Sequence, residues 1–229
     1  MRNFLAVALL VALNSANLSY AGLIKSYDFD GTFTDTLGNG VDIVASGGTL
    51  SGGRYSFANN QGLRLTNALP STTDYGIELR FQVNDSVAGY NKLIDFQALA
   101  SDIGLYVRDG SIDFYTAGPT GGSIALNTDY TVGLARSGST IEVFLDGVSL
   151  FSVADSNQAV SAGNILNFFE DDNATSQRES FIGSVDWIRI HDDASTFGTQ
   201  PVQAVPEPSS LLLFSLLGTL GLRLRRRKV

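Results

Sequence analysis

The chain is 229 residues long and has a formal net charge of −8, one histidine and no cysteine. The lack of cysteine excludes disulfides and cysteine nucleophiles, and a single histidine excludes a zinc site built from several histidines. Because an acidic chain repels phosphate groups, the composition also argues against binding to nucleic acid.

The first 21 residues have the pattern of a secretory signal peptide. Arg2 gives a positive start, residues 4–13 are apolar, and Ser19-Tyr20-Ala21 places small residues at the two positions that signal peptidase reads. The pattern predicts export and cleavage by signal peptidase after Ala21. An earlier cut near Ser15 and Ala16 is the alternative.

Residues 22–195 are expected to form one all-β domain. β-Branched and aromatic residues alternate with polar ones in this region, and helical periodicity is nowhere sustained. Fourteen short strands without helices favour two stacked antiparallel sheets over one wide sheet. The predicted strands are 24–29, 41–45, 54–57, 62–65, 74–83, 92–97, 103–108, 111–115, 123–126, 130–136, 140–145, 148–153, 165–169 and 181–190.

Local patterns inside this region fix two turns and one strand orientation. Asp109-Gly110 and Asp146-Gly147 each separate two strand-like stretches, and such a pair favours a two-residue hairpin because both positions need positive φ. In residues 74–83 the large apolar side chains occupy alternate positions. Glu78 and Arg80 lie between them, so we expect a solvated strand face at these two residues and not a catalytic pair.

Three landmarks in this region resemble those of laminin G-like domains. They are residues 27–31 (YDFDG) near the start, residues 130–147 with the FLDG hairpin at 144–147, and residues 183–190 (GSVDWIRI) at the end. The resemblance implies an antiparallel jelly-roll sandwich of the concanavalin A-like class. It also implies that the first and last strands lie side by side, which would bring Asp30 near Asp186.

The most concentrated polar segment is Glu170-Asp171-Asp172-Asn173, followed by Glu179. Carboxylates this close repel one another unless they are solvated, protonated or bridged by a cation, and clustered oxygen ligands suit Ca²⁺. Laminin G-like domains often bind calcium at a rim, so the resemblance favours the same reading. We predict a calcium site and leave a solvated acidic loop as the alternative. The candidate ligands are Asp171, Asp172 and Glu179, with Asp30 and Asp186 as weaker candidates.

Catalysis is not expected. A glycosidase needs two carboxylates that flank the sugar bond, and no predicted strand carries the acidic motif of sandwich glucanases. A Ser-His-Asp triad would have to use His191, which we expect at the surface where the last strand ends, and no serine lies in a nucleophile-elbow motif. The sequence therefore predicts a protein without enzymatic activity.

Aromatic side chains are the candidate platforms for sugar binding, although most must belong to the core. Phe168 and Phe169 are adjacent, so in a strand only one of them can face inward. Trp187 lies in the apolar last strand, where we expect it to be packed. The sequence identifies no binding face. The candidates are Tyr90, Tyr106, Tyr115, Phe168, Phe169 and Trp187.

The C-terminal segment carries a recognisable tail. A linker, residues 196–205, precedes Pro206-Glu207-Pro208, an apolar run over 209–222 and a cluster of basic residues. At about 1.5 Å per residue the apolar run spans only about 21 Å, so as a transmembrane helix it would be a marginal anchor in the inner membrane. Basic residues resist crossing the bilayer and would stay cytoplasmic. The basic residues are Arg223, Arg225, Arg226, Arg227 and Lys228.

Taken together, residues 206–229 resemble the PEP-CTERM sorting signal of Gram-negative bacteria. The resemblance implies cleavage near Pro206-Glu207-Pro208 by the membrane enzyme exosortase. An ordinary single-pass anchor that is never cut is the alternative.

These patterns together predict an exported protein of the cell envelope, cell surface or extracellular matrix. We expect it to bind a glycan or another matrix polymer without catalysis. A glycosidase on the same fold and a purely structural matrix protein are the alternatives.

Overall fold

A computed structural model describes residues 22–115, 120–155 and 163–194. The predicted signal peptide, the linker and the sorting tail lie outside these ranges. The chain divides into one unit that ends at Gly198 and a second unit from Thr199 to Val229, and the second unit lies outside the described residues. Fifteen strands and no helix occur in the described ranges, in agreement with the predicted all-β class.

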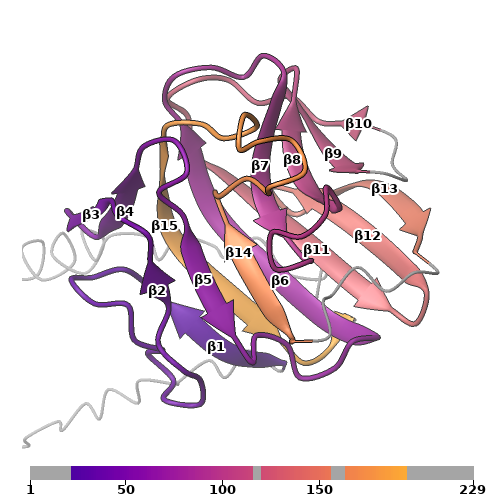
Figure 1. Ribbon diagram of the computed structural model, residues 1–229. Helices are drawn as coiled ribbons and strands as arrows, with labels where there is room; N and C mark the ends of the chain where they lie inside the picture. Colours follow the sequence, from indigo (N-terminus) through magenta and orange to yellow (C-terminus); the bar gives the residue numbers. More distant parts are fainter. Residues whose placement is uncertain (1–21, 116–119, 156–162, 195–229) are drawn as a thin grey trace, which may run out of the picture. The chain divides into compact units, whose positions relative to one another are not determined.

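The strands form two antiparallel sheets (Figure 1). In spatial order, the first sheet consists of β13 (Val148–Ala154), β12 (Thr140–Leu145), β11 (Tyr130–Ser137), β6 (Asp74–Val83), β15 (Gly183–His191), β4 (Arg54–Phe57) and β3 (Thr49–Ser51), and β1 (Leu23–Tyr27) also pairs with β15. The second sheet consists of β10 (Thr120–Gly121), β9 (Ser111–Tyr115), β8 (Gly104–Arg108), β7 (Tyr90–Asp95), β14 (Ile165–Phe168), β5 (Leu63–Thr66) and β2 (Val44–Ala45).

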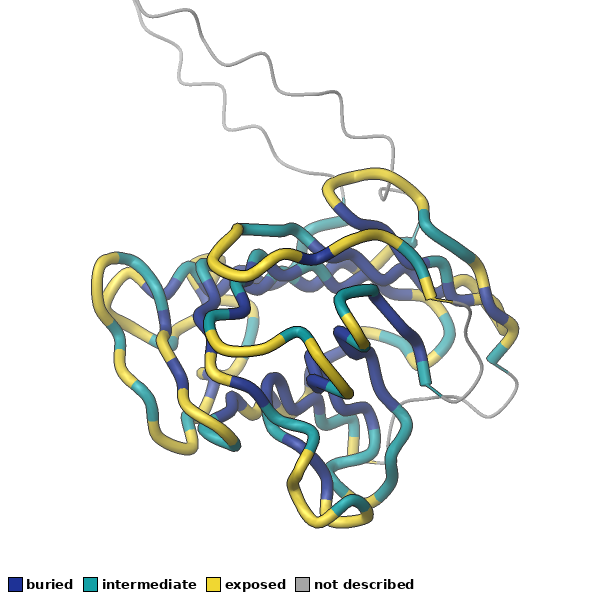
Figure 2. Tube along the Cα trace, turned by 90° about the horizontal axis from the view of Figure 1, so that it is seen from above, coloured by how far each residue is buried: buried dark blue, intermediate teal, exposed yellow. Residues whose placement is uncertain are grey.

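The core lies between the two sheets, and the connecting loops are the most exposed parts (Figure 2). Strand β6 illustrates why: its apolar residues alternate with polar ones, so a single face turns to the opposite sheet. Glu78 and Arg80 lie on the other face, as predicted. The core residues of β6 are at most 1% exposed: Tyr75, Ile77, Leu79, Phe81 and Val83.

The first and last strands are neighbours, as the sequence resemblance implies. Strand β15 pairs with β6 along one edge, and its other edge is shared by β4 near Gly183 and by β1 near His191. The predicted two-sheet antiparallel sandwich is therefore confirmed. The jelly-roll and concanavalin A-like class stays a prediction from the resemblance.

The two predicted Asp-Gly hairpins are confirmed. Asp109 and Gly110 join β8 to β9 with φ of 47° and 77°, and Asp146 and Gly147 join β12 to β13 with φ of 48° and 78°. These left-handed conformations are the ones that a two-residue hairpin turn requires.

One strand prediction is wrong, and two strands, β3 and β10, were not predicted. Residues 123–126 form no strand, although Ile124 is buried, because its N–H donates to the Gly110 carbonyl in a loop that delivers the side chain to the core. The apolar pattern there reflects burial without strand pairing. Strand β3 was not predicted; it is three residues long and pairs with β4 across the tight turn at Gly52 and Gly53.

Phe168 and Phe169 are both fully buried, in contrast to the expectation for adjacent strand residues. Strand β14 ends at Phe168, and Phe169 has φ of 60°. This left-handed turn redirects the chain, so the second ring also points inward. The Phe169 ring stacks on Phe57 with their centroids 4.4 Å apart.

A β-bulge at Asp186 sets the orientation of the last strand. Val185 pairs with Phe81 and Ile188 pairs with Leu79, so Asp186 is an extra residue in β15. Without it, alternation would direct Trp187 into the core together with Val185. The bulge turns Trp187 to the outer face, where it is half-buried and stacks with Arg189 at 4.1 Å, so its packing is against the surface of the sheet and not in the core.

Candidate functional site

The predicted acidic segment folds over the outer face of β7, around one buried lysine. Lys92, Asp171 and Asp172 are each fully buried. The Lys92 ammonium group pairs with Asp172 and lies 3.4 Å from the Asp171 carboxylate. The chain itself thus supplies one positive charge to these two buried carboxylates, and the Asp102 carboxylate lies 3.7 Å from the same ammonium group.

Backbone groups hold the same segment in place. The N–H of Lys92 donates to the Glu179 carbonyl at 2.8 Å, and the N–H of Phe169 donates to the Leu93 carbonyl at 3.1 Å. Asp172 Oδ1 accepts hydrogen bonds from two N–H groups that follow it in the chain. Burial alone would raise the pKa of Asp172, but Lys92 and these N–H groups together hold that pKa below its usual range.

Glu179 has the opposite environment. Its Oε2 atom is buried and has no hydrogen-bond partner. Burial, together with the neighbouring carboxylates of Asp102 and Asp171, raises the pKa of Glu179 to about 7. Of the three ways to relieve repulsion in this segment, the structure therefore uses an internal cation at Lys92, and the raised pKa of Glu179 favours its protonated form below about pH 7.

The five predicted calcium ligands do not form one group. Asp186 pairs with Arg80 at 3.5 Å, and Asp30 is an exposed residue beside Gly53. In the described ranges, no group of three or more acidic or histidine side chains is placed to hold a metal ion. Asp171 and Asp172 are also not solvated, so the alternative reading of a solvated loop is wrong for these two. Calcium binding itself stays a prediction.

The aromatic candidates on the second sheet are engaged with one another. The rings of Tyr90, Tyr106 and Tyr115 meet edge to face with centroids 5.6–6.2 Å apart. Lys92 lies over the Tyr106 ring at 4.9 Å, and Arg108 lies over the Tyr90 ring at 4.8 Å. Cations thus cover two of the three rings, which reduces the area available for sugar stacking.

His191 is buried and not at the surface as expected. It is the last residue of β15, and its Nε2 lies 3.2 Å from a Glu78 carboxylate oxygen. The side chain therefore belongs to the packing of the first sheet.

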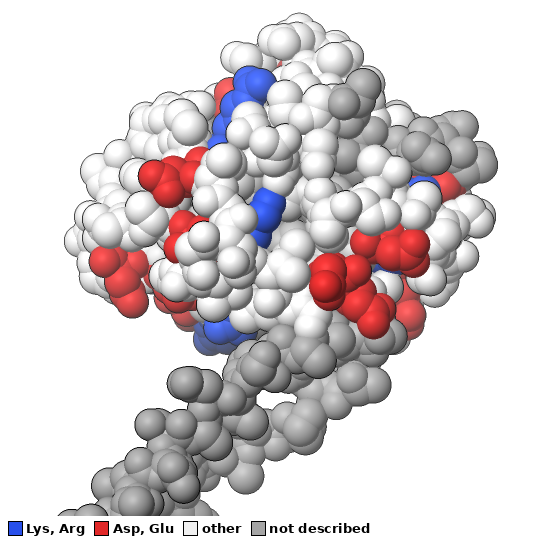
Figure 3. Space-filling model, turned by 90° about the horizontal axis from the view of Figure 1, so that it is seen from below, with Lys and Arg blue, Asp and Glu red and all other residues white. Residues whose placement is uncertain are grey.

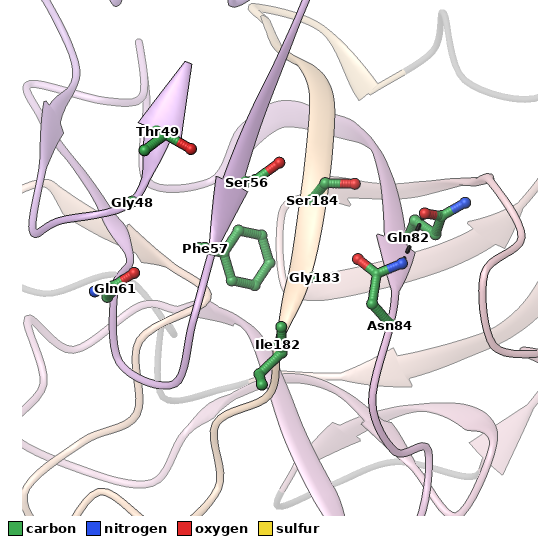
Figure 4. A pocket seen from close by; sticks show the side chains of 10 residues that line it. All are labelled: Gly48, Thr49, Ser56, Phe57, Gln61, Gln82, Asn84, Ile182, Gly183 and Ser184. Carbon is green, nitrogen blue, oxygen red and sulfur yellow. Dashed lines mark hydrogen bonds between the residues drawn. The ribbon is translucent and has the colours of Figure 1, made fainter. Parts of the chain in front are cut away.

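A groove on the first sheet was not predicted. It crosses four neighbouring strands, β3, β4, β15 and β6. Each strand contributes one residue that pairs directly with the next across the sheet, namely Thr49, Ser56, Ser184 and Gln82. Their side chains line a cavity of about 490 Å³. Figure 4 shows the groove with Phe57 and Ile182 between the polar side chains. The remaining lining residues are Gly48, Gln61, Asn84 and Gly183.

The groove is lined by neutral residues. Hydroxyl and carboxamide groups supply both donors and acceptors, and Ile182, which is 44% exposed, adds an apolar surface. Asn84 Nδ2 donates to Gln82 Oε1 at 2.7 Å and to Asn127 Oδ1 at 3.0 Å, so the two amides at one end are held in fixed orientations. Such a surface suits a neutral, hydroxyl-rich ligand.

Charged residues border the groove without lining it. Arg54 Nε donates to Ser184 Oγ at 3.1 Å, and its guanidinium group pairs with Asp129 at 2.8 Å. Arg80 lies between Asp129 and Asp186 at 3.7 and 3.5 Å. This network fixes the Ser184 hydroxyl at the border of the groove.

Residues 22–115, 120–155 and 163–194 contain no helix long and apolar enough to cross a membrane. On the face shown in Figure 3, acidic side chains lie in several patches with basic side chains between some of them.

The C-terminal segment matches a known family. Residues 204–228 match the model of the PEP-CTERM protein-sorting motif. This match supports the prediction that the chain is an exosortase substrate, exported through the membrane to the cell envelope or surface. A search of curated proteins gave no match to the chain.

Several solved structures have a similar fold. One is the sialidase of Trypanosoma rangeli in complex with 2,3-difluorosialic acid, with 14% identity and a TM-score of 0.59 over 76% of this chain and 31% of that one. Another is domain 4 of AbnA, a GH43 extracellular arabinanase from Geobacillus stearothermophilus, in complex with arabinotriose; identity is 18% and the TM-score 0.55 over 76% of this chain and 94% of that one.

The binding domain of botulinum neurotoxin serotype D is similar too, with 11% identity and a TM-score of 0.58 over 76% of this chain and 49% of that one. The chain thus spans about a third of the sialidase and about half of the neurotoxin domain. At these identities the similarity shows the fold alone.

Proposed function

We propose that the protein is a non-catalytic binding protein of the cell surface or extracellular matrix, and that it holds a neutral polysaccharide in the groove of the first sheet. The observation that carries the proposal is the row of in-register residues Thr49, Ser56, Ser184 and Gln82, which presents uncharged hydroxyl and amide groups along one cavity. Sugar hydroxyl groups are matched by such donors and acceptors.

Two further findings support this proposal. The sorting motif directs the protein towards the cell envelope or surface, where polysaccharides are available as ligands. One structural neighbour, domain 4 of the arabinanase, was solved with arabinotriose, which is a neutral sugar. Fold similarity does not by itself fix function, so the groove chemistry remains the main support.

Binding can be tested by affinity electrophoresis of the full chain through gels that contain neutral or acidic polysaccharides, with and without Ca²⁺. We expect retardation by at least one neutral polymer and none by acidic ones. The Gln82→Ala variant should weaken binding about fivefold to tenfold, because it removes one hydrogen-bonding group. Ser152→Ala is the matched control, since Ser152 is exposed on β13 of the same sheet, outside the groove.

The alternative functions predict different outcomes when the same protein is tested with the same polysaccharides. Hydrolysis of a retained polymer would support the glycosidase alternative, and loss of matrix integrity on gene deletion, without retention on any gel, would support a purely structural role. Retention that is unchanged by Gln82→Ala would show that the groove is not the binding site.

Processing by exosortase is tested separately. We expect the mature protein to end near Pro206-Glu207-Pro208 in cells with exosortase and to keep its basic C-terminus in cells without it. Intact mass spectrometry distinguishes the two forms. A full-length tail in both strains would support the uncut-anchor alternative.

A further inference from the structure

The cluster around Lys92 contains the chemical groups needed for a reaction between side chains, in addition to an ion pair. The Lys92 amino group and the Asp172 carboxyl group are in direct contact, and both side chains are fully excluded from solvent. They come from β7 and from the loop after β14, 80 positions apart in the chain. A nucleophile and an acyl carbon are thus held together in a dry environment.

Asp171 supplies a second carboxyl group at the same point. Its Oδ1 atom lies 3.4 Å from Lys92 Nζ, is buried, and accepts no hydrogen bond. Its Oδ2 atom is fixed by the Thr175 hydroxyl at 2.6 Å and by the Glu179 N–H at 2.8 Å. One oxygen therefore anchors the side chain, and the other faces the lysine and can accept a proton.

Asp172 is held like an acyl group in an oxyanion hole. Its Oδ1 atom accepts the N–H of Ala174 at 2.7 Å and the N–H of Thr175 at 3.1 Å, whereas Oδ2 contacts Lys92. If an amine attacked the carboxyl carbon, charge would develop on Oδ1, where two backbone donors already point.

We propose that Lys92 and Asp172 form an intramolecular isopeptide bond, with Asp171 as the proton carrier. Asp171 Oδ1 takes a proton from the Lys92 ammonium group and passes it to Asp172 Oδ2, so the neutral amine attacks the carbon of a carboxylic acid and not of a carboxylate. In the tetrahedral intermediate a second proton passes from Nζ through Asp171 to the same Oδ2 atom. The C–Oδ2 bond then breaks, and the products are one amide and one water molecule. No oxidant, reductant or cofactor is needed.

The site favours this condensation for three reasons. The fixed contact replaces a bimolecular encounter, and well-oriented intramolecular groups reach effective concentrations of about 10⁵–10⁸ M. The product amide removes one buried pair of charges, whose desolvation is costly, and leaves Asp171 as the remaining buried carboxylate. The remaining Nζ–H then faces Asp171 Oδ1, which lacks a donor in the ion-paired form.

The product would link β7 covalently to the loop that precedes β15. The chain has no cysteine, so an exported domain of this kind has no disulfide to close a long loop. An isopeptide bond would restrict the unfolded chain in the same way and would resist reducing agents.

The test is peptide mapping of the purified full chain after folding. Trypsin would normally cut after Lys92, between Arg80 and Arg108. With the bond, residues 81–108 stay uncut at Lys92 and are joined to residues 137–178, and the joined peptide is lighter by one water. Fragmentation should place the link on Asp172. Normal cleavage at Lys92 without water loss would overturn the proposal, and a link to Asp171 would overturn the assigned acceptor.

Variants separate the roles of the three residues. Lys92→Arg keeps the charge and should abolish the link, as should Asp172→Ala. Asp171→Asn should slow formation about a hundredfold or more and change its pH profile, because a proton carrier is lost; Asp171→Glu should restore part of the rate. Asp186→Asn, outside the cluster, is the control and should crosslink fully. Full-rate crosslinking in Asp171→Asn would remove Asp171 from the mechanism.

Discussion

Replacing Glu179 with glutamine should stabilise the folded protein at neutral and alkaline pH but not in acid. In the folded state, burial and the carboxylates of Asp102 and Asp171 raise the pKa of Glu179 from 4.5 to about 7. Well below pH 4.5 Glu179 is protonated in both the folded and the unfolded state, so its environment does not lower the free energy of unfolding. Between these pKa values the unfolded chain loses the proton first, so the free energy of unfolding falls as pH rises. Above about pH 7 the penalty is complete.

The size of this penalty follows from the shift. A rise from 4.5 to about 7 corresponds to at most about 3.4 kcal/mol, because one pKa unit equals about 1.4 kcal/mol. Glu179 is only half-buried, and solvent screening of a partly exposed carboxylate reduces the value to about 1–2 kcal/mol. Glutamine keeps the shape and removes the charge. The variant should gain this amount at about pH 8 and nothing at about pH 4.

Urea denaturation at a series of pH values measures the difference directly. Glu142→Gln is a suitable control, because Glu142 lies on β12 and accepts a hydrogen bond from Ser149, away from the cluster. A gain of equal size in acid and at high pH would contradict an ionisation penalty. Destabilisation at high pH would show that the Glu179 charge supports Lys92 more than it repels its neighbours.

Two further predictions concern other parts of the molecule, and a third concerns calcium at the acidic segment. Gly183→Ala should lower the free energy of unfolding by about 1–3 kcal/mol in urea titrations, because a β-carbon there would lie 2.5 Å from the Gln82 carbonyl oxygen and 2.9 Å from the Phe57 ring; an unchanged value would contradict this packing. Arg136→Met should cost about 3–5 kcal/mol, since it removes one partner of a buried ion pair with Asp155, and a thermal melt close to that of the unaltered protein would refute it. Calcium binding at the acidic segment predicts a higher melting temperature with Ca²⁺ and a lower one with chelator, and a melt that neither addition changes would remove that prediction.

Local chemistry explains which parts of the fold were predictable. The alternation in β6 and the Asp-Gly turns depend on neighbouring residues only, and both are confirmed. Residues 123–126 show the limit of this reasoning, because a loop can bury Ile124 without forming a strand. The bulge at Asp186 left no separate signal in the sequence, since pairing with β6 decides where the extra residue lies.

The candidate sites were predictable to different degrees. The acidic segment stands out in the sequence, but its counter-charge, Lys92, is about 80 residues away and reads as an ordinary strand residue. The groove gave even less warning, because serine, threonine and glutamine on the outer face of a strand are common. In the sequence, the groove is indicated only by polar residues at the outward-facing positions of its strands. This pattern does not predict which strands will be neighbours.

The sequence by itself determined the all-β class and the sorting motif that marks the protein for export, because periodicity, turn chemistry and the motif are each contained in contiguous residues. Strand order and register decided everything that joins distant residues: the alignment of Ser56, Ser184 and Gln82 in one groove, and the burial of Lys92 among carboxylates. Pairing between strands depends on contacts across the whole domain, so neither arrangement could be read from one segment alone.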